Sequence, residues 1–206
     1  MNFEAYCNKV IKNIFDILFS TLIVIFIFSW FFPLIAALIK LSSRGPVFFV
    51  QKRFGINNKV FKCIKFRTMY INKESDIKPA LIDDSRVTPL GKHLRKYHFD
   101  EFPQFINVLV GDMSIVGPRP HMIEQSNELS NSLNQYSLRR KMKPGITGLA
   151  QLKGFSNQDS YIRLMQKRNK LDVLYIKKWS LSLDFYIIYL TILKIIRNIY
   201  YEQTNK

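Results

Sequence analysis

The longest uncharged apolar run in the chain extends from Ile17 to Ile39, between Asp16 and Lys40. A run of about 20 apolar residues is long enough to cross a bilayer as an α-helix. The segment before it carries few basic residues, and no small-residue cleavage site follows it, so it does not match a secretory signal peptide. The pattern therefore predicts a membrane anchor near the start of the sequence.

Pro33 interrupts this run, and Ser29 lies four residues before it. Proline removes a backbone donor and kinks a helix, and a serine hydroxyl can satisfy a backbone group that the kink frees. The run then either spans the membrane as a kinked helix, or breaks near Ser29 to Pro33 and returns to the face that it entered. Basic residues lie beyond both ends and favour the same, cytoplasmic side, so the pattern favours re-entry. These flanking residues are Lys9, Lys12, Lys40, Arg44, Lys52 and Arg53.

Two short strand patterns follow the apolar run. Residues 47–50 are apolar, and residues 60–69 alternate apolar and polar side chains as a half-buried strand does, with a turn at residues 57–58 between them. The alternation places Lys65 and Arg67 on one face, where two cations can hold a diphosphate. A solvated edge strand with protective lysines has the same pattern, so both interpretations stand.

Most of the remaining chain is helical in pattern. Thr88 is a suitable N-cap for a helix over residues 91–98, with Pro89 at the first helical position. Three later segments also have helical patterns, and residues 71–84 predict a polar loop. The three segments are residues 100–110, 125–141 and 163–179.

Residues 179–201 are apolar but carry Asp184, Lys194 and Arg197. The uncharged part, residues 185–193, is too short to span a bilayer. The segment is rich in Tyr and begins with Trp, and these residues prefer the boundary between water and lipid. The pattern predicts an amphipathic helix in the membrane interface, although a helix packed on the protein core fits equally well.

The densest candidate chemistry is a pair of adjacent acids, Asp100 and Glu101, which follows a cationic cluster that includes Arg95. Arg119 lies between two prolines, which hold it on a stiff segment. Two carboxylates among ammonium and guanidinium groups suit phosphate chemistry, because the cations neutralise phosphoryl oxygens while the acids hold a metal or attack phosphorus. A capped helix with solvated charges explains the acid pair alone more simply. With the Pro-Arg-Pro segment added, the two interpretations balance.

The chain has 31 basic and 15 acidic residues, a net charge of +16. Such an excess points to a polyanionic partner: nucleic acid, anionic lipid or a nucleotide-linked substrate. Cys7 and Cys63 form no Cys-x-x-Cys pair, so the sequence indicates neither a disulfide framework nor a zinc site. Gly145 and Gly148 allow a backbone to approach a ligand closely, but their spacing fits neither a Walker loop nor a Rossmann fingerprint.

Six segments follow one another in an order that is typical of one family. They are Ser-Arg-Gly-Pro-Val-Phe-Phe at 43–49, Lys-Phe-Arg-Thr-Met at 65–69, Asp-Glu-Phe-Pro-Gln at 100–104, Asn-Val-Leu-Val-Gly-Asp-Met-Ser-Ile-Val-Gly-Pro-Arg-Pro at 107–120, Lys-Pro-Gly-Ile-Thr-Gly-Leu-Ala-Gln at 143–151 and Asp-Val-Leu-Tyr-Ile at 172–176. Together they resemble the bacterial sugar transferases, the monotopic polyprenyl-phosphate phosphoglycosyl transferases. The resemblance covers nearly the whole chain.

The chain departs from that family's pattern at three places. In the anchor, Phe32 stands before Pro33 where the family has a Ser-Pro or similar break, so the expected hairpin rests on Pro33 with Ser29. Leu149 stands where the family usually has Trp, and residues 153–155 read Lys-Gly-Phe where it often has Asn-Gly-Arg. The missing arginine concerns nucleotide or sugar contacts in that loop and not the phosphoryl chemistry.

The resemblance implies transfer of a sugar-1-phosphate from a UDP-sugar to a polyprenyl phosphate of the undecaprenyl type, with release of UMP. In the family's pattern, Asp100 attacks the sugar-bearing phosphorus and forms a phosphosugar-aspartyl intermediate, which the lipid phosphate then attacks. Glu101, with Asp100 beside it, would bind Mg²⁺, or Mn²⁺ in its place. The side chains expected to bind substrate are Lys65, Arg67, Arg95, Arg119 and Lys143.

We therefore expect an α+β, mostly helical fold. Residues 1–42 are expected to form the re-entrant anchor, a helix hairpin broken near Pro33. Residues 43–206 are expected to form a catalytic domain with a short β element and interfacial helices, on the cytoplasmic face of the bacterial inner membrane. The expected partners are a UDP-sugar, a polyprenyl phosphate and membrane lipid, with a homodimer left open and no nucleic acid. The alternatives are a membrane-tethered basic protein that binds nucleic acid or acts as a scaffold, and a hydrolase that passes the phosphosugar to water.

Overall fold

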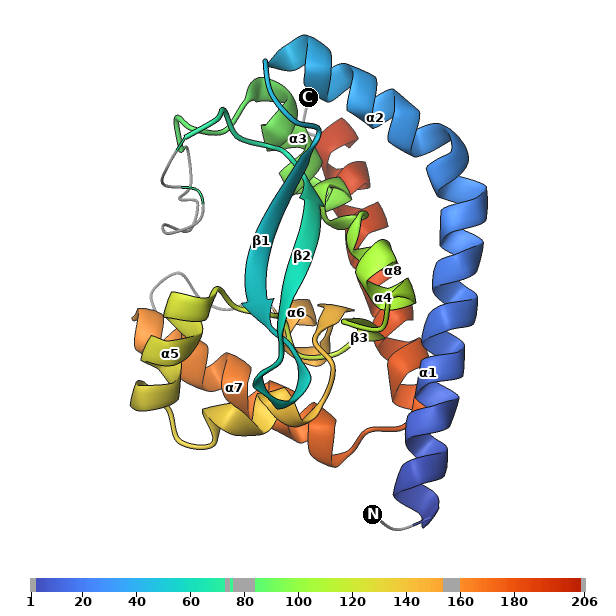
Figure 1. Ribbon diagram of the computed structural model, residues 1–206, viewed down its shortest axis with the longest axis vertical. Helices are drawn as coiled ribbons and strands as arrows, with labels where there is room; N and C mark the ends of the chain where they lie inside the picture. The colour runs from blue at the N-terminus through green and yellow to red at the C-terminus, as the bar shows by residue number, and fades with distance from the viewer. Residues whose placement is uncertain (1–2, 73–74, 76–83, 154–159, 205–206) are drawn as a thin grey trace.

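The computed structural model describes residues 3–72, 75, 84–153 and 160–204. Most of the loop predicted for residues 71–84 lies outside these ranges. The described chain is mostly helical and contains two small two-stranded sheets (Figure 1), which confirms the expected mostly helical α+β class. A long bent helix runs along one side of the molecule, and the other elements lie beside it.

The N-terminal apolar segment forms α1 (Phe3–Ile23), a π-helical turn η1 (Val24–Phe28) and α2 (Ser29–Ser42). A π-turn disturbs the regular hydrogen-bond ladder and bends a helix, so the bend begins about one turn before the predicted place. Ser29 and Pro33 lie in the first turns of α2. In Figure 1, α2 leaves α1 at a wide angle and crosses the top of the molecule, so the two do not lie side by side as a hairpin.

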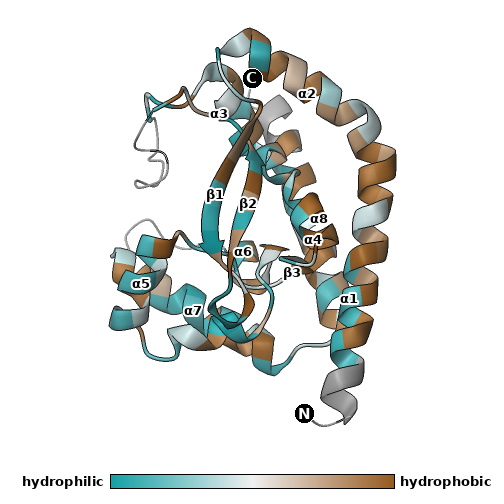
Figure 2. Ribbon diagram, viewed as in Figure 1, coloured by the Kyte–Doolittle hydropathy of each residue, from teal (hydrophilic) through white to brown (hydrophobic). Residues whose placement is uncertain are grey.

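The segment Asn8–Ser42 is long and apolar enough to cross a membrane, by length and composition, and no other helix of the described chain is. Apolar residues line its outer edge in Figure 2, and many of their side chains are exposed. An apolar surface of this size on a protein marks contact with a membrane or with another protein. The exposed residues include Ile17, Leu18, Leu22, Phe26, Trp30 and Leu34.

The predicted strands form an antiparallel hairpin of β1 (Phe48–Phe54) and β2 (Val60–Phe66), paired along their whole length. The turn between them, η2 (Ile56–Asn58), contains Asn57 with φ 52° and Asn58 with φ 63°. Asparagine tolerates this left-handed region better than most residues, so the turn predicted here is confirmed.

A second sheet pairs β3 (Ser114–Val116) with β4 (Gly145–Thr147) in parallel. The two backbones meet so closely that a Cβ on Gly145 would lie 2.0 Å from the amide nitrogen of Gly117. Position 145 therefore requires glycine. The sequence suggested that this glycine admits a ligand, whereas its close neighbour in the structure is the backbone just before Pro118.

Thr88 caps α3 (Pro89–Lys96) as predicted, because its hydroxyl oxygen accepts a hydrogen bond from the amide of Gly91 at 2.9 Å. The main hydrophobic core lies under β2 and includes Phe105 and Val108 of α4 (Gln104–Leu109). The helix predicted over residues 100–110 is shorter than expected, because α4 covers only residues 104–109.

The single helix predicted over residues 125–141 is two elements. α5 (Ile123–Ser132) is followed by the 3-10 helix η4 (Tyr136–Lys141). Gln135, with φ 61°, separates them, and a continuous α-helix does not allow that angle.

The last helices are α6 (Leu149–Leu152), α7 (Tyr161–Lys177) and α8 (Leu181–Thr204). Among its described side chains, α8 buries only Asp184 and Ile187. The first turns of α8 therefore pack on the core, as predicted for a core helix. The helix also exposes an apolar and aromatic surface, as predicted for an interfacial helix. The exposed side chains include Phe185, Tyr186, Tyr189, Leu193, Ile196 and Tyr200.

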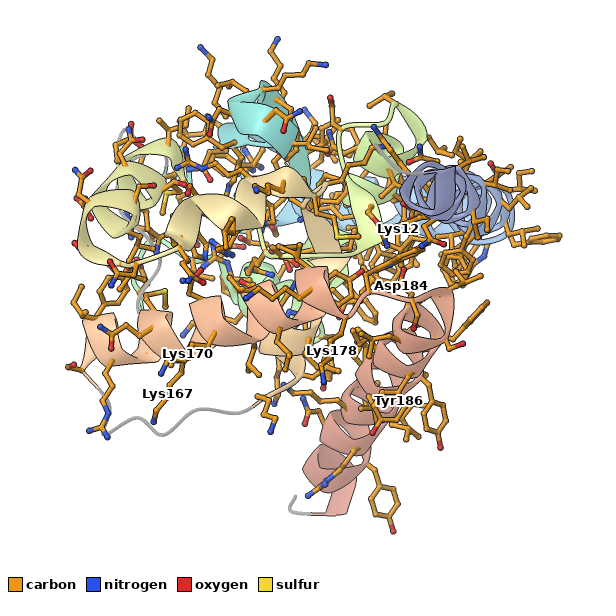
Figure 3. The ribbon with its side chains drawn as sticks, turned by 90° about the horizontal axis from the view of Figure 1, so that it is seen from below. Lys12, Lys167, Lys170, Lys178, Asp184 and Tyr186 are labelled. Atoms are coloured by element: carbon orange, nitrogen blue, oxygen red, sulfur yellow. The ribbon has the colours of Figure 1, made fainter. Side chains whose placement is uncertain are left out.

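A buried polar cluster fastens α1 to α8. The Lys12 Nζ lies 2.6 Å from the Asp184 carboxylate, with side-chain exposures of 8 % and 0 %. The Tyr175 hydroxyl and the Trp179 indole donate to the same carboxylate at 2.6 and 3.0 Å. Figure 3 shows Lys12 reaching from α1 to Asp184 near the start of α8. Because Lys12 is buried in an ion pair, its charge does not contribute to the basic flank that was used to predict the side of the membrane on which the helix begins.

One turn further along α1, Asp16 contacts β3. Its carboxylate accepts hydrogen bonds from the Ser114 hydroxyl and the Ile115 amide, both at 3.0 Å. A carboxylate next to an apolar run would be costly to bury without such partners. The charged residue that begins the apolar run is therefore a contact between the anchor and the sheet.

Replacing Lys12 with Met should destabilise the protein by about 3–5 kcal/mol, because it leaves the Asp184 charge buried without its partner. Lys9 lies on the exposed side of α1 and provides the matched control. Chemical denaturation in detergent should show the loss for Lys12→Met and almost none for Lys9→Met. Equal stabilities of the two variants would show that the ion pair does not hold α1 in place.

Candidate active site

The two adjacent acids lie in a short 3-10 helix, η3 (Phe99–Glu101), between α3 and α4. His98 precedes them with φ 59°, which turns the chain sharply after α3. Asp100 and Glu101 are 8 % and 6 % exposed. The interpretation as a capped helix with solvated charges is therefore wrong, because both acids are buried and α4 begins only at Gln104.

Glu101 is held by two cations from distant parts of the chain. The Nζ of Lys65, on β2, lies 2.6 Å from Oε1 of Glu101. Arg119, three residues after β3, contacts both oxygens, through Nη2 to Oε1 at 2.5 Å and through Nη1 to Oε2 at 3.1 Å. This two-pronged contact is the geometry that a guanidinium forms with a carboxylate and a lysine cannot form.

The same surroundings separate the pKa values of the two acids. Burial raises the pKa of Asp100 to about 6, and the neighbouring charge of Glu101 adds to that rise. Burial also acts to raise the pKa of Glu101, but Arg119 and Lys65 outweigh it and hold that pKa below its usual range. Within the described chain no hydrogen bond holds the Asp100 carboxylate. Glu101 is thus a fixed anion, and Asp100 is a carboxylate available for chemistry.

Both acids line a cavity of about 520 Å³, a volume typical of small-molecule sites. Its wall is rich in cations, which suits a phosphate-bearing ligand. The cationic side chains that line it are Arg53, Lys65, Arg67, Arg95, Arg119 and Arg168.

The structure brings together most, but not all, of the side chains predicted to bind substrate. Lys65, Arg95 and Arg119 line the cavity, and the Nε of Arg95 donates to the Thr68 hydroxyl at 2.7 Å. Lys143 is not among the lining residues, because its Nζ donates to Asn13 of α1 at 3.0 Å. The structure therefore places Lys143 outside this cavity.

Arg67 also lines the cavity, and its guanidinium binds backbone carbonyls. Its two terminal nitrogens donate to the carbonyl oxygens of Arg44 and Ser43, each at 2.7 Å. Because β2 ends at Phe66, Arg67 does not continue the strand face that carries Lys65. Arg67 therefore fastens the chain that follows α2, and of the two cations predicted to hold a diphosphate only Lys65 contacts the acid pair.

A second set of residues, none of them predicted to bind substrate, holds the backbone around Arg119. The carbonyl of Pro118 accepts from the Gly145 amide at 3.0 Å, and that of Arg119 accepts from the Arg139 guanidinium at 2.8 Å. The carbonyl of Pro120 accepts from the Arg53 guanidinium. All three carbonyls of the Pro-Arg-Pro segment are thus bound.

Arg139 is in turn fixed by α7. Its Nε donates to the Asp172 carboxylate at 2.8 Å, and both side chains are buried. Its Nη1 lies 3.0 Å from Nδ1 of His121, which also lies 2.6 Å from the Tyr136 hydroxyl. Burial lowers the pKa of His121 well below its usual range, and the charge of Arg139 lowers it further, so the imidazole is neutral. These contacts join segments that are far apart in the sequence, so only the structure reveals them, although Asp172 begins one of the family-like segments.

The described residues contain no group of three or more His, Cys, Asp or Glu side chains that forms a metal site by itself. Magnesium does not need one, since it is commonly held by one or two carboxylates together with substrate phosphates and water. Asp100 and Glu101 are two such carboxylates, and Glu101 Oε2 accepts a single hydrogen bond, from Arg119. These residues therefore fit a magnesium ion that is bound jointly with a phosphate.

A family model described as bacterial sugar transferase matches residues 7–198. The chain belongs to this family. It is 45% identical over 188 residues to a UDP-glucose:undecaprenyl-phosphate glucose-1-phosphate transferase of Klebsiella pneumoniae, covering 91% of this chain and 40% of that protein. It is 39% identical over 190 residues to the exopolysaccharide production protein PSS of Rhizobium leguminosarum bv. phaseoli, covering 90% of this chain and 94% of that protein.

A relative from Caulobacter vibrioides with the same transferase name as the Klebsiella protein is 38% identical over 182 residues, covering 88% of this chain and 68% of that protein. Compared with the Klebsiella and Escherichia coli relatives, the chain spans about two fifths of the relative's length.

Replacing Arg119 with Lys should lower the rate of the reaction at this site by roughly 10–100-fold, because hydrogen bonds to charged groups contribute about 1.5–3 kcal/mol and lysine cannot reach both oxygens of Glu101. Arg163, on the exposed side of α7, provides a control for the same substitution. Initial rates of transfer measure both variants. A rate for Arg119→Lys equal to that for Arg163→Lys would show that the two-pronged contact is dispensable.

Proposed function

We propose that the protein transfers a sugar-1-phosphate from a UDP-sugar to polyprenyl phosphate, of the undecaprenyl type in bacteria, and releases UMP. This would be the first membrane step in the assembly of a glycan such as an exopolysaccharide, a capsule or an O-antigen. The observation that carries the proposal is the separation of the two acids: Glu101 is neutralised by Lys65 and Arg119, while Asp100 faces a cation-lined cavity. The names of the relatives make UDP-glucose the first donor to test.

In the first step, a carboxylate oxygen of Asp100 attacks the sugar-bearing phosphorus of the donor. The bond between that phosphorus and the bridging oxygen breaks, and UMP leaves with the electron pair. The product is a phosphosugar ester of Asp100. In the second step, a phosphate oxygen of the polyprenyl phosphate attacks the same phosphorus, and the Asp100 carboxylate leaves unchanged.

The cations around the acids have donors left for the substrate. Lysine has three N–H groups and arginine has five, and Glu101 and Gln151 take only some of those on Lys65 and Arg119. Lys65, Arg119 and Arg95 then stabilise the charge that develops on the phosphoryl oxygens. A bound Mg²⁺, or Mn²⁺ in its place, would add a further positive charge beside Asp100 and Glu101.

We also propose that the apolar helix enters the inner membrane from the cytoplasmic side and returns to it. Lys12 and Asp16, near one end of the helix, bind Asp184 and β3, and Ile39, near the other end, packs against Phe66 and Leu94. Both ends are thus attached to one catalytic domain, which a helix that spans the bilayer would not allow. The exposed apolar surface of α8 would lie in the interface of the same leaflet.

Basic side chains next to that surface suit anionic headgroups. Figure 3 shows Lys167 and Lys170 along α7 and Lys178 just after its end, with Tyr186 on the neighbouring α8. Each lysine near an anionic membrane surface contributes about 1 kcal/mol of binding.

The test is release of UMP from UDP-glucose and other UDP-sugars by purified protein in detergent, with and without undecaprenyl phosphate. The wild-type protein should turn over only with the acceptor, and Asp100→Asn should abolish both turnover and the trapped phosphosugar adduct. Asp112→Asn changes an acid outside the cavity and should retain activity. UMP or sugar-phosphate release that continues without acceptor would instead indicate a hydrolase, and an adduct retained in Asp100→Asn would assign the nucleophile elsewhere.

The rate of adduct formation should fall about tenfold per pH unit below about pH 6, because protonation removes the attacking carboxylate of Asp100. Arg95 lowers the pKa of Asp100, so Arg95→Gln should move the midpoint to higher pH. Lys92→Gln, one turn earlier on the exposed side of α3, should leave it in place. Rapid-quench measurements with donor alone avoid titration of the lipid phosphate. A profile that is flat between pH 5 and pH 8 in all three proteins would contradict this assignment.

A further inference from the structure

A second cavity, of about 530 Å³, adjoins the same two side chains, Glu101 and Arg119. His98, His121 and Arg168 also line both cavities. The rest of the first cavity is lined mainly by the β1–β2 hairpin and the segment after β2. The apolar part of the second is lined mainly by α1, η1, α6 and α8. The two cavities therefore meet at one ion pair and differ in most of their walls.

The walls of the second cavity are largely hydrocarbon. On one side, Phe19, Ile23 and Ile27 follow one another at intervals of four residues along α1 and η1. On the other side, Ile188 and Ile192 do the same on α8, and this spacing places them on one helical face. The cavity thus lies between two helices whose outer faces are themselves apolar and exposed.

The inner end of this cavity is polar. Arg119 lies there, and Arg139, Arg168 and Asp172 also line the cavity. Lys194, an exposed lining residue, donates through its Nζ to the carbonyls of Gln151 and Leu152 at 3.2 and 3.3 Å. The Gln151 side chain accepts from Arg119 at 2.9 Å, while its own amide nitrogen is buried and has no hydrogen-bond partner in the described chain. A buried donor of this kind is costly unless a ligand satisfies it.

We propose that the second cavity binds the acceptor, with the first isoprene units between α1 and α8 and the phosphate at the inner end beside Arg119. This inference rests on the proposed transfer reaction. A hydrocarbon chain that ends in a phosphate matches apolar walls with a cationic end, whereas a nucleotide sugar would leave its hydroxyls and base against hydrocarbon. The rest of the chain would leave the cavity along the exposed apolar faces of the two helices.

Separate cavities have a kinetic consequence. The donor reaches Asp100 through the cation-rich cavity, and the acceptor reaches the phosphosugar ester through the apolar one. A change in the apolar walls should therefore impair the second step and leave the first step intact.

Ile192 and Ile196 form a matched pair for this test. They lie one turn apart on α8 and are 50% and 56% exposed, so neither belongs to the core. Ile192 lines the cavity and Ile196 does not. Tryptophan at position 192 should fill part of the space between the helices, and at position 196 it should face outward.

The experiment measures the two steps separately in detergent. UDP-glucose, or the donor found by the UMP assay, forms the adduct without acceptor; undecaprenyl phosphate or farnesyl phosphate is then added. Ile192→Trp should raise the KM for undecaprenyl phosphate about tenfold or more, which corresponds to about 1.4 kcal/mol, and leave adduct formation within about twofold of wild type. Ile196→Trp should change neither step. The wild-type preference for the longer acceptor should shrink in Ile192→Trp.

Two results would overturn the proposal. One is that Ile192→Trp leaves both steps unchanged, and the other is that it slows adduct formation as much as transfer. Either result would show that this cavity does not bind the acceptor. Failure of the underlying reaction looks different: the wild-type protein itself would then form no adduct and release no UMP from any UDP-sugar.

Discussion

The interaction on which the structure depends is the buried ion pair of Glu101 with Lys65 and Arg119. A buried carboxylate is costly to desolvate, and removing one of its cationic partners leaves a buried charge uncompensated. The three side chains come from β2, from η3 and from the segment after β3. The hairpin, the helices around η3 and the second sheet must therefore be placed correctly relative to one another before the site exists.

The rest of the fold supports this placement. The parallel pair of β3 and β4 and the Arg139–Asp172 ion pair hold the backbone of the Pro-Arg-Pro segment, and Asp16 connects β3 to the apolar helix. The residue that contacts the apolar helix and the residue that contacts the acid are thus four positions apart, at Ile115 and Arg119. For the proposed transfer to a lipid phosphate such a connection matters, because the height of the apolar helix in a membrane would also set the height of the acids.

The sequence predicted the parts of this arrangement that depend on local pattern. The apolar run, the Thr88 cap, the asparagine turn and the acid pair near Arg119 were all apparent from residue types and spacing. It did not predict that Arg67 binds backbone carbonyls or that Lys143 binds Asn13, because both partners are far away along the chain. The sequence also did not predict the π-turn before Ser29 or the ion pair of Arg139 with Asp172. Tertiary packing decides both features, and no local pattern of residues marks them.

The central claim is that the ion pair leaves Asp100 as the carboxylate that attacks phosphorus. The most direct measurement is peptide mapping by mass spectrometry, after the protein is mixed with its UDP-sugar, without acceptor, and quenched in acid. The account predicts one phosphosugar on the peptide that contains the acid pair, with fragmentation that places it on Asp100. A phosphosugar on Glu101 or on another residue, or release of UMP with no modified peptide at all, would contradict it.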